Sequence, residues 1–184
     1  MKRCLWVNLD NPLYVKYHDE EWGKPSYDDK YLFEMLLLES FQAGLSWECI
    51  LNKRKYFKEA FDAFDYKKIS LYDEKKVKEL LNNSNIIRNK LKINASINNA
   101  KIFMKIQKEY GSFSNYIWGF TNNKIIYNVN KTSNELSDEI SNDLKKRGMK
   151  FVGTTIIYSY LQSIGIINDH DSDCEFKEEA WKYI

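Results

Sequence analysis

One acidic side chain stands in an otherwise apolar part of this sequence. At helical spacing the neighbours of Glu39 are Met35, Leu36, Gln42 and Ala43, so most of its face is hydrophobic and should be buried. An ionised carboxylate in such a place costs several kcal/mol, in order of magnitude, unless a cation or hydrogen-bond donor meets it. The partner is either a cationic ligand or one of the 28 lysines and arginines of the chain, and Glu39 by itself leaves both alternatives open.

Aromatic residues occur on both sides of Glu39 in the sequence. Trp47 follows it at the start of the next predicted helix, and the first 27 residues contribute Trp6, Tyr17 and Trp22. A negative group among electron-rich rings favours a flat cation, which gains a charge-assisted hydrogen bond and cation–π contact. We therefore predict a pocket bordered by Glu39, Trp47 and Tyr17. The alternative, above all for Trp6 and Trp22, is an ordinary aromatic core.

The two histidines of the chain each lie near a cysteine, one pair at either end. Cys4 accompanies His18, and His170 accompanies Cys174. Together the four side chains would complete a tetrahedral zinc site that fastens the terminal segments and leaves no position open for water, which makes it structural. Their separations match no zinc-finger spacing, so four unrelated residues are the alternative. Cys49 is expected to be a small, buried and inert residue.

Length and composition indicate one helical domain. The 184 residues, 43% of them hydrophobic, can build one core or two closely joined lobes. Seven glycines and two prolines among many helix formers favour an all-α fold, and a net charge of +2 demands no polyanionic partner. No apolar run approaches the ~18 residues of a membrane span, and no signal peptide is evident. We expect a soluble, intracellular protein.

Capping residues predict the helices that carry the pocket. One helix should run from Asp28 to Ala43, and the next should begin at Ser46, so that Gly44 and Leu45 form the link. Further helices are predicted over residues 73–82, 88–110, 112–122, 137–147 and 153–165. The remaining segments are predicted to be irregular: residues 1–27 and 124–137, with 125–127 the only candidate strand.

A short turn joins two of these helices at residues 83–90. Asn85 stands where a left-handed residue would be wanted, and the backbone N–H groups opening the next helix lie beside Arg88, Lys90 and Lys92. Such a helix–hairpin–helix binds a nucleic-acid backbone without reading bases, although a solvated corner is the alternative. Two further basic clusters are candidate phosphate contacts: Lys53–Lys55 and Lys145–Arg147.

Matched blocks along nearly the whole chain add a family resemblance to these patterns. The blocks are Arg3–Cys4 with Trp6, Pro12–Tyr14, Tyr17–Asp19, Glu21–Gly23, Leu32–Glu34, Glu39, Gln42–Trp47, Ile86–Arg88, Lys145–Gly148, Lys150–Thr155 and Asn168–His170. In them the sequence resembles DNA-3-methyladenine glycosylase I, a family of helix–hairpin–helix glycosylases. The resemblance implies one glycosylase domain, residues 1–184, made of two closely packed helical lobes with zinc tying the terminal segments.

The resemblance also implies an activity and the residues responsible. It implies base-excision repair of alkylated double-stranded DNA, by hydrolysis of the N-glycosidic bond of 3-methyladenine, with release of the free base. Glu39 is the expected catalytic residue, and Cys4, His18, His170 and Cys174 are the expected zinc ligands. Five rings are expected to contact the base: Trp6, Tyr14, Tyr17, Trp22 and Trp47. Expected DNA contacts are Gln42, Gly44, Leu45 as the wedge that fills the stack, Arg88 and Lys90.

Some departures and rival functions remain open at this point. Asn85 and Leu91 stand where the family usually has glycine, and residues 118–123 contain no aspartate like the catalytic one of larger relatives. One rival function is a non-catalytic binder of damaged or single-stranded DNA. Another is a zinc hydrolase, which would need an open metal position. A cytoplasmic monomer with no membrane association is expected.

Overall fold

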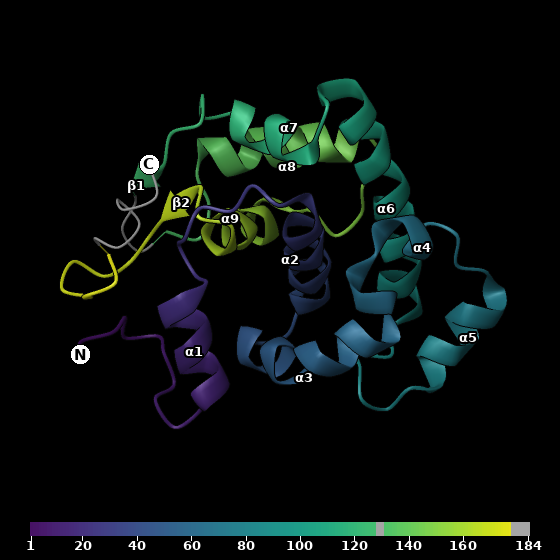
Figure 1. Ribbon diagram of the computed structural model, residues 1–184, viewed down its shortest axis with the longest axis horizontal. Helices are drawn as coiled ribbons and strands as arrows, with labels where there is room; N and C mark the ends of the chain where they lie inside the picture. The colour runs from purple at the N-terminus through teal and green to yellow at the C-terminus, as the bar shows by residue number, and fades with distance from the viewer. Residues whose placement is uncertain (128–130, 178–184) are drawn as a thin grey trace.

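The computed structural model describes residues 1–127 and 131–177 and is almost entirely helical (Figure 1). Its helices are α1 (Pro12–Glu20), α2 (Asp29–Gln42), α3 (Trp47–Ala60), α4 (Tyr66–Ile69), α5 (Glu74–Asn82), α6 (Lys90–Tyr110), α7 (Phe113–Gly119), α8 (Glu135–Lys146) and α9 (Thr154–Ser163). A 3₁₀ turn covers Asp62–Phe64, and two short strands, β1 (Ile126–Tyr127) and β2 (Ile167–Asn168), pair in parallel. The predicted all-α class is confirmed.

Helix α2 is the centre of the molecule because it is apolar on nearly every side. Nine of the ten positions from Leu32 to Phe41 are buried, and a helix of this kind must be covered all round. Helices α3, α6 and α9 all pack against α2, and α8 packs against α9, above it in Figure 1. These helices therefore share α2 as a packing partner, and Glu39 lies within its buried stretch.

The helix boundaries near the predicted pocket agree with the sequence. The Asp28 side chain accepts a hydrogen bond from the Lys30 N–H, and Ser46 Oγ accepts one from the Cys49 N–H at 3.2 Å. The predicted starts of two other helices, α8 and α6, are wrong. Helix α8 begins after Asn134, whose side chain bonds the Ser137 N–H at 2.8 Å, so Ser137 is a partner in the capping box rather than the cap.

The start of α6 and the turn before it also differ from the prediction. Asn89 caps α6 through a 3.1 Å hydrogen bond from the Lys92 N–H, so the helix begins at Lys90 rather than at residue 88. Asn85 does not have the left-handed conformation predicted for it. Its N–H instead donates to Asn83 Oδ1 at 3.0 Å, and an Asx turn of this kind forms without positive φ.

The N-terminal segment, predicted to be irregular, contains α1. Asn11 caps it and Pro12 occupies its first turn, a start signal present in the sequence but masked by weak apolar periodicity. In residues 124–137, the predicted strand appears as β1, which pairs with β2 from 41 positions further along the chain (Ile126 with Ile167). Positions 128–130 of that segment lie outside the described residues.

Gly165 lets the end of α9 contact the chain that leads into α2. Its φ is +76°, and a Cβ added there would overlap the Lys24 carbonyl and the Pro25 nitrogen. The same approach is held by the Ser26 N–H, which donates to the Ile164 carbonyl at 3.0 Å. Because the overlapping atoms are backbone, a side chain at this position forces α9 and the N-terminal segment apart.

We expect Gly165→Ala to lower the free energy of unfolding by at least ~2 kcal/mol in urea titrations, because it adds both a clash and left-handed strain. Gly119→Ala is the matched control. A Cβ at Gly119 meets nothing within 4 Å, and the residue ends a helix, so the change should be neutral or slightly stabilising. Equal effects of the two substitutions would contradict the close approach.

Candidate functional site

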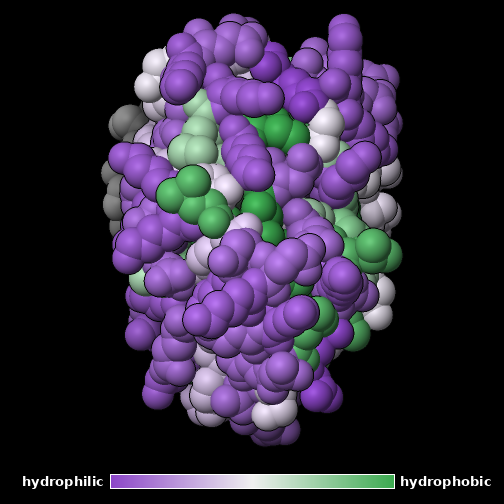
Figure 2. Space-filling view, turned by 90° about the vertical axis from the view of Figure 1, so that its right-hand side faces the viewer, coloured by the Kyte–Doolittle hydropathy of each residue, from purple (hydrophilic) through white to green (hydrophobic). Residues whose placement is uncertain are grey.

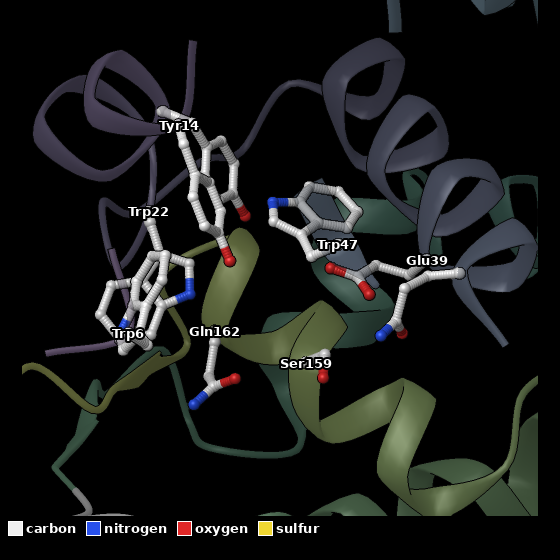
Figure 3. Close-up of a pocket in the computed structure, with 9 residues that line it drawn as sticks. Trp6, Tyr14, Trp22, Glu39, Trp47, Ser159 and Gln162 are labelled. Atoms are coloured by element: carbon white, nitrogen blue, oxygen red, sulfur yellow. The ribbon is translucent and has the colours of Figure 1, made fainter. Parts of the chain in front are cut away.

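Side chains from four helices and the N-terminal segment surround a cavity of about 200 Å³ (Figure 3). Its lining consists of Trp6, Tyr14, Tyr17, Trp22, Glu39, Gln42, Trp47, Ser159 and Gln162. The structure thus brings together all five rings predicted to contact a base, as well as the acid. In Figure 3 the Glu39 carboxyl points toward the cavity below the Trp47 ring.

Glu39 has no cationic partner in the described part of the protein. Its side chain is 3% exposed, and Oε2 is buried without any hydrogen-bond donor. The alternative of an internal salt bridge is therefore wrong. Burial alone raises the pKa of Glu39 from 4.5 to about 8, because no charge or donor favours the ionised form. Near neutral pH the carboxyl group is largely protonated in the free protein.

The cavity walls are rings set at angles to one another. Tyr17 and Trp47 lie 5.2 Å apart between ring centroids at 48°, and Trp6 lies edge-on to Trp22 at 4.7 Å and 70°. Trp47 Nε1 is buried without an acceptor. The cavity therefore presents aromatic faces and two unpaired buried polar atoms, Glu39 Oε2 and Trp47 Nε1. A flat molecule with both donors and acceptors on its edge satisfies this arrangement.

Helix α9 contributes two polar lining residues that the sequence analysis missed. Ser159 and Gln162 are one turn apart on this otherwise apolar helix, and that polar interruption was the available signal. The amide of Gln162 is fixed in place, because Nε2 donates to Asp169 Oδ2 at 2.9 Å. Tyr158 donates to the same carboxylate oxygen at 3.0 Å. Asp169 immediately precedes His170, so it connects the floor of the cavity to the segment that holds His170.

The four predicted metal ligands lie together in one buried cluster. The ligand atoms of Cys4, His18, His170 and Cys174 are all within 4.8 Å of one another. Zinc–sulfur and zinc–nitrogen bonds of ~2.3 and ~2.0 Å give tetrahedral edges of roughly 3.3–3.8 Å, so a small inward movement would suffice. The cluster, which links the N-terminal segment to the C-terminal one, could therefore hold a metal ion.

Hydrogen bonds hold both imidazoles in the orientation that a metal requires. His18 Nδ1 contacts Asp19 Oδ1 at 2.8 Å and His170 Nδ1 contacts Asn168 Oδ1 at 2.9 Å, which leaves each Nε2 facing the cluster. His170 Nε2 is buried without a partner. Burial lowers the pKa of His18 and lowers that of His170 to about 3, so both rings are neutral and able to act as ligands.

The same imidazoles form the support of the aromatic wall. His170 lies edge-on to Trp22 with centroids 4.6 Å apart, and His18 lies 5.3 Å from Trp6. Gly23 leaves the space that the His170 ring occupies, since a Cβ there would lie 2.6 Å from its Cε1. The metal cluster and the cavity therefore share one layer of rings.

The predicted DNA contacts lie on the surface around the link between α2 and α3 and at the start of α6. Gly44 has φ +77°, Leu45 is 38% exposed, and Arg88 and Lys90 are exposed. Gln42 both lines the cavity and donates to the Leu45 carbonyl at 3.2 Å. Figure 2 shows the side of the molecule formed by α4 to α6 to be largely hydrophilic.

Three other residues from the predicted phosphate-contact clusters form ion pairs or hydrogen bonds with groups of the protein itself. Arg54 pairs with Glu21 at 2.8 Å and Glu34 at 2.7 Å. Lys92 is only 7% exposed and donates to main-chain carbonyls of α2. Arg147 pairs with acidic side chains on α6 and α8. These three residues already have partners within the protein, and phosphate contact by them stays a prediction. Cys49, predicted to be buried, is partly exposed.

Comparison with known proteins agrees with the geometry. The model of the family "Methyladenine glycosylase" matches residues 6–178. DNA-3-methyladenine glycosylase 1 of Escherichia coli K12 is 43% identical over 95% of this chain and 96% of its own, and the Haemophilus influenzae DNA-3-methyladenine glycosylase is 42% identical over 95% and 97%. This chain belongs to the methyladenine glycosylase family.

Solved structures give the same result. The crystal structure of a Tyr-to-Phe variant of 3-methyladenine DNA glycosylase I in complex with 3-methyladenine has a TM-score of 0.92 at 35% identity, over 96% of this chain and 98% of that one. The enzyme of Staphylococcus aureus gives 0.91 at 36% identity, over 96% and 97%. In the described part of the chain, no helix has the length and apolar character of a membrane span.

We expect Glu39→Gln to stabilise the protein increasingly as pH rises from 4.5 to 8. Below 4.5 the carboxyl is protonated in both states; above it the unfolded chain ionises while the folded protein retains the proton, so wild-type stability falls relative to the variant. The difference should reach roughly 2–4 kcal/mol in urea titrations near pH 8. A difference independent of pH would show that Glu39 ionises normally.

Proposed function

We propose that this protein removes 3-methyladenine from alkylated DNA by hydrolysing the N-glycosidic bond, which leaves an abasic site. The observation that carries the proposal is the unpaired Glu39 carboxyl enclosed by aromatic rings. Family membership and the complex of a similar enzyme with 3-methyladenine support the same substrate. In this proposal Glu39 is the catalytic residue, and Trp6, Tyr14, Tyr17, Trp22 and Trp47 bind the base.

The charge of the substrate explains why so few catalytic groups are needed. Adenine methylated at N3 is cationic while attached to deoxyribose, so its glycosidic bond is already weakened and the base departs neutral. The protein must therefore supply access and discrimination more than acid–base catalysis. The nucleotide is extruded from the duplex and its base stacks between rings, with Glu39 at its edge.

Discrimination against normal adenine follows from the state of Glu39 in the free protein. A cationic base lowers the pKa of an adjacent carboxyl, so Glu39 releases its proton to solvent when the base binds and forms an ion pair with the base in a site of low dielectric. Neutral adenine offers no such compensation. The energetic cost of burying the acid is thus recovered only by the damaged base.

Contacts outside the cavity would hold the distorted duplex. Leu45 is the proposed wedge, with Gly44 and Gln42 shaping the link that presents it. Exposed Arg88 and Lys90, at the start of α6, are proposed to contact phosphates. The protein is proposed to act as a monomer on double-stranded DNA in the cytoplasm, where a bacterial chromosome lies.

The buried cysteine–histidine cluster is proposed to hold one structural zinc ion. Two thiols and two neutral imidazoles with fixed Nδ1 atoms fit that ion, which when bound supplies cross-linking and no catalysis, since four protein ligands fill its coordination. The side chains of this cluster would then fasten the N-terminal segment to the segment after β2, behind Trp6 and Trp22.

We expect Glu39→Gln to reduce release of 3-methyladenine from methylated duplex DNA by about 10²-fold or more, because a neutral amide cannot pair with the cationic base. Binding to DNA with an abasic-site analogue should stay within about threefold, since surface contacts dominate it. Free base is measured by chromatography. Glu59→Gln, an exposed acid on α3, is the control. Unchanged turnover by the Glu39→Gln variant would refute the catalytic role of Glu39. If the wild-type protein bound methylated DNA but released no base, the non-catalytic DNA-binding function would be favoured.

We expect Cys4→Ser to lower both zinc content and the melting temperature, by 5 °C or more in order of magnitude, because it removes a ligand from a closed site. Cys49→Ser changes the same side chain outside the cluster and should retain the metal. Metal is counted by mass spectrometry on purified protein. Full zinc occupancy in Cys4→Ser would contradict this ligand set.

A further inference from the structure

Lys92 is a buried lysine whose ammonium group forms hydrogen bonds at the C-terminal end of another helix, α2. It lies in the first turn of α6, and Nζ donates to the Phe41 carbonyl at 2.8 Å and the Ala43 carbonyl at 2.6 Å. Carbonyls at a helix C-terminus lack intrahelical donors and carry partial negative charge, so a cation suits them. No carboxylate among the described residues pairs with Lys92, and its side chain is committed to α2.

The end of α2 that Lys92 holds carries both the cavity and the wedge. Gln42 lines the cavity, the Leu45 N–H donates to the Gln42 carbonyl at 2.7 Å, and the Gln42 amide donates back to the Leu45 carbonyl at 3.2 Å. The link is therefore one hydrogen-bonded unit continuous with the helix that carries Glu39. A displacement of the α2 C-terminus would move Leu45 relative to the cavity mouth.

Lys92 itself lies just after the helical hairpin of residues 83–90, which is proposed to bind phosphates together with the start of α6. Asn89 caps α6 through the Lys92 N–H at 3.1 Å, with exposed Arg88 and Lys90 on either side of it. A second lysine makes a similar tie, because Lys53 Nζ on α3 donates to the Asn85 carbonyl in the hairpin turn at 3.1 Å. The hairpin is thus fastened to both helices that flank the Gly44–Leu45 link.

We propose that Lys92 is a positioning residue that locks the hairpin to the α2 C-terminus, so that phosphates held at α6 fix where Leu45 enters the duplex. This deepens the proposed function and rests on it. Extrusion of the nucleotide distorts the DNA between the phosphates bound at the start of α6 and the site where Leu45 enters the duplex. The protein must therefore hold these two contact regions rigidly relative to each other. Lys92 touches neither base nor sugar in this role, and its loss should affect duplex processing more than base binding.

The test compares Lys92→Met with the wild type on DNA treated with a methylating agent. We expect kcat for 3-methyladenine release from duplex DNA to fall at least tenfold, while release from single-stranded DNA falls less than threefold because no stacked partner strand must be opened. Affinity for free 3-methyladenine, followed by tryptophan fluorescence, should stay within twofold. Lys92→Arg should recover most of the duplex rate. Lys101→Met, an exposed lysine on the same helix, is the matched control.

A double-mutant cycle with Leu45→Ala separates positioning from general stability. If Lys92 acts through the link, Lys92→Met should cause little further loss of duplex rate in the Leu45→Ala background. Additive losses, or parallel loss of base affinity and of both rates, would overturn the inference. Should Lys92→Met not fold by circular dichroism, Lys92→Gln takes its place in the cycle. A wild type that releases no base would overturn the proposed function and this inference with it, whereas an active wild type with unchanged Lys92→Met refutes the inference alone.

Discussion

The structure depends on one unfavourable feature, a carboxyl group buried in the central helix without a counter-charge. Glu39 is 3% exposed and its pKa is raised to about 8 by burial alone. Such a group lowers stability at neutral pH, and a protein tolerates it where function needs it. Because Oε2 of Glu39 is buried without a hydrogen-bond partner, a cation bound beside it would favour the ionised carboxylate, which the free protein does not stabilise.

The cationic side chains near the cavity are held away from this acid. Arg54 is committed to Glu21 and Glu34, and Lys92 to carbonyls of α2. In the proposed function these pairings help to keep the site selective, because a lysine beside Glu39 would pair with its carboxylate and remove the proposed preference for a charged base. The pairings that look merely structural thus maintain the electrostatics of the pocket.

The cysteine–histidine cluster and the cavity are connected through shared side chains. His18 and His170 pack against Trp6 and Trp22, and Asp169, next to His170, fixes the amide of Gln162 in the cavity floor. In the proposed function, fastening the terminal segments at this cluster also positions Trp6 and Trp22, which lie outside the helices on either side of α1. This explains how an irregular N-terminal segment can supply rings at defined angles.

The sequence by itself determined the helical class, the boundaries of α2, the start of α3, the acid in an apolar stretch, the rings and the two cysteine–histidine pairs, because these follow from local periodicity, capping and residue type. It could not determine which cations meet which anions. In the sequence, Arg54 and Lys92 were indistinguishable from surface charges. Only weak local signals indicated α1, the β1–β2 pairing and the α9 residues Ser159 and Gln162. Their roles depend on contacts between residues from 20 positions apart, as for Arg54 and Glu34, to 120 positions apart, as for Glu39 and Ser159. Such contacts are fixed by packing of the whole chain rather than by neighbouring residues.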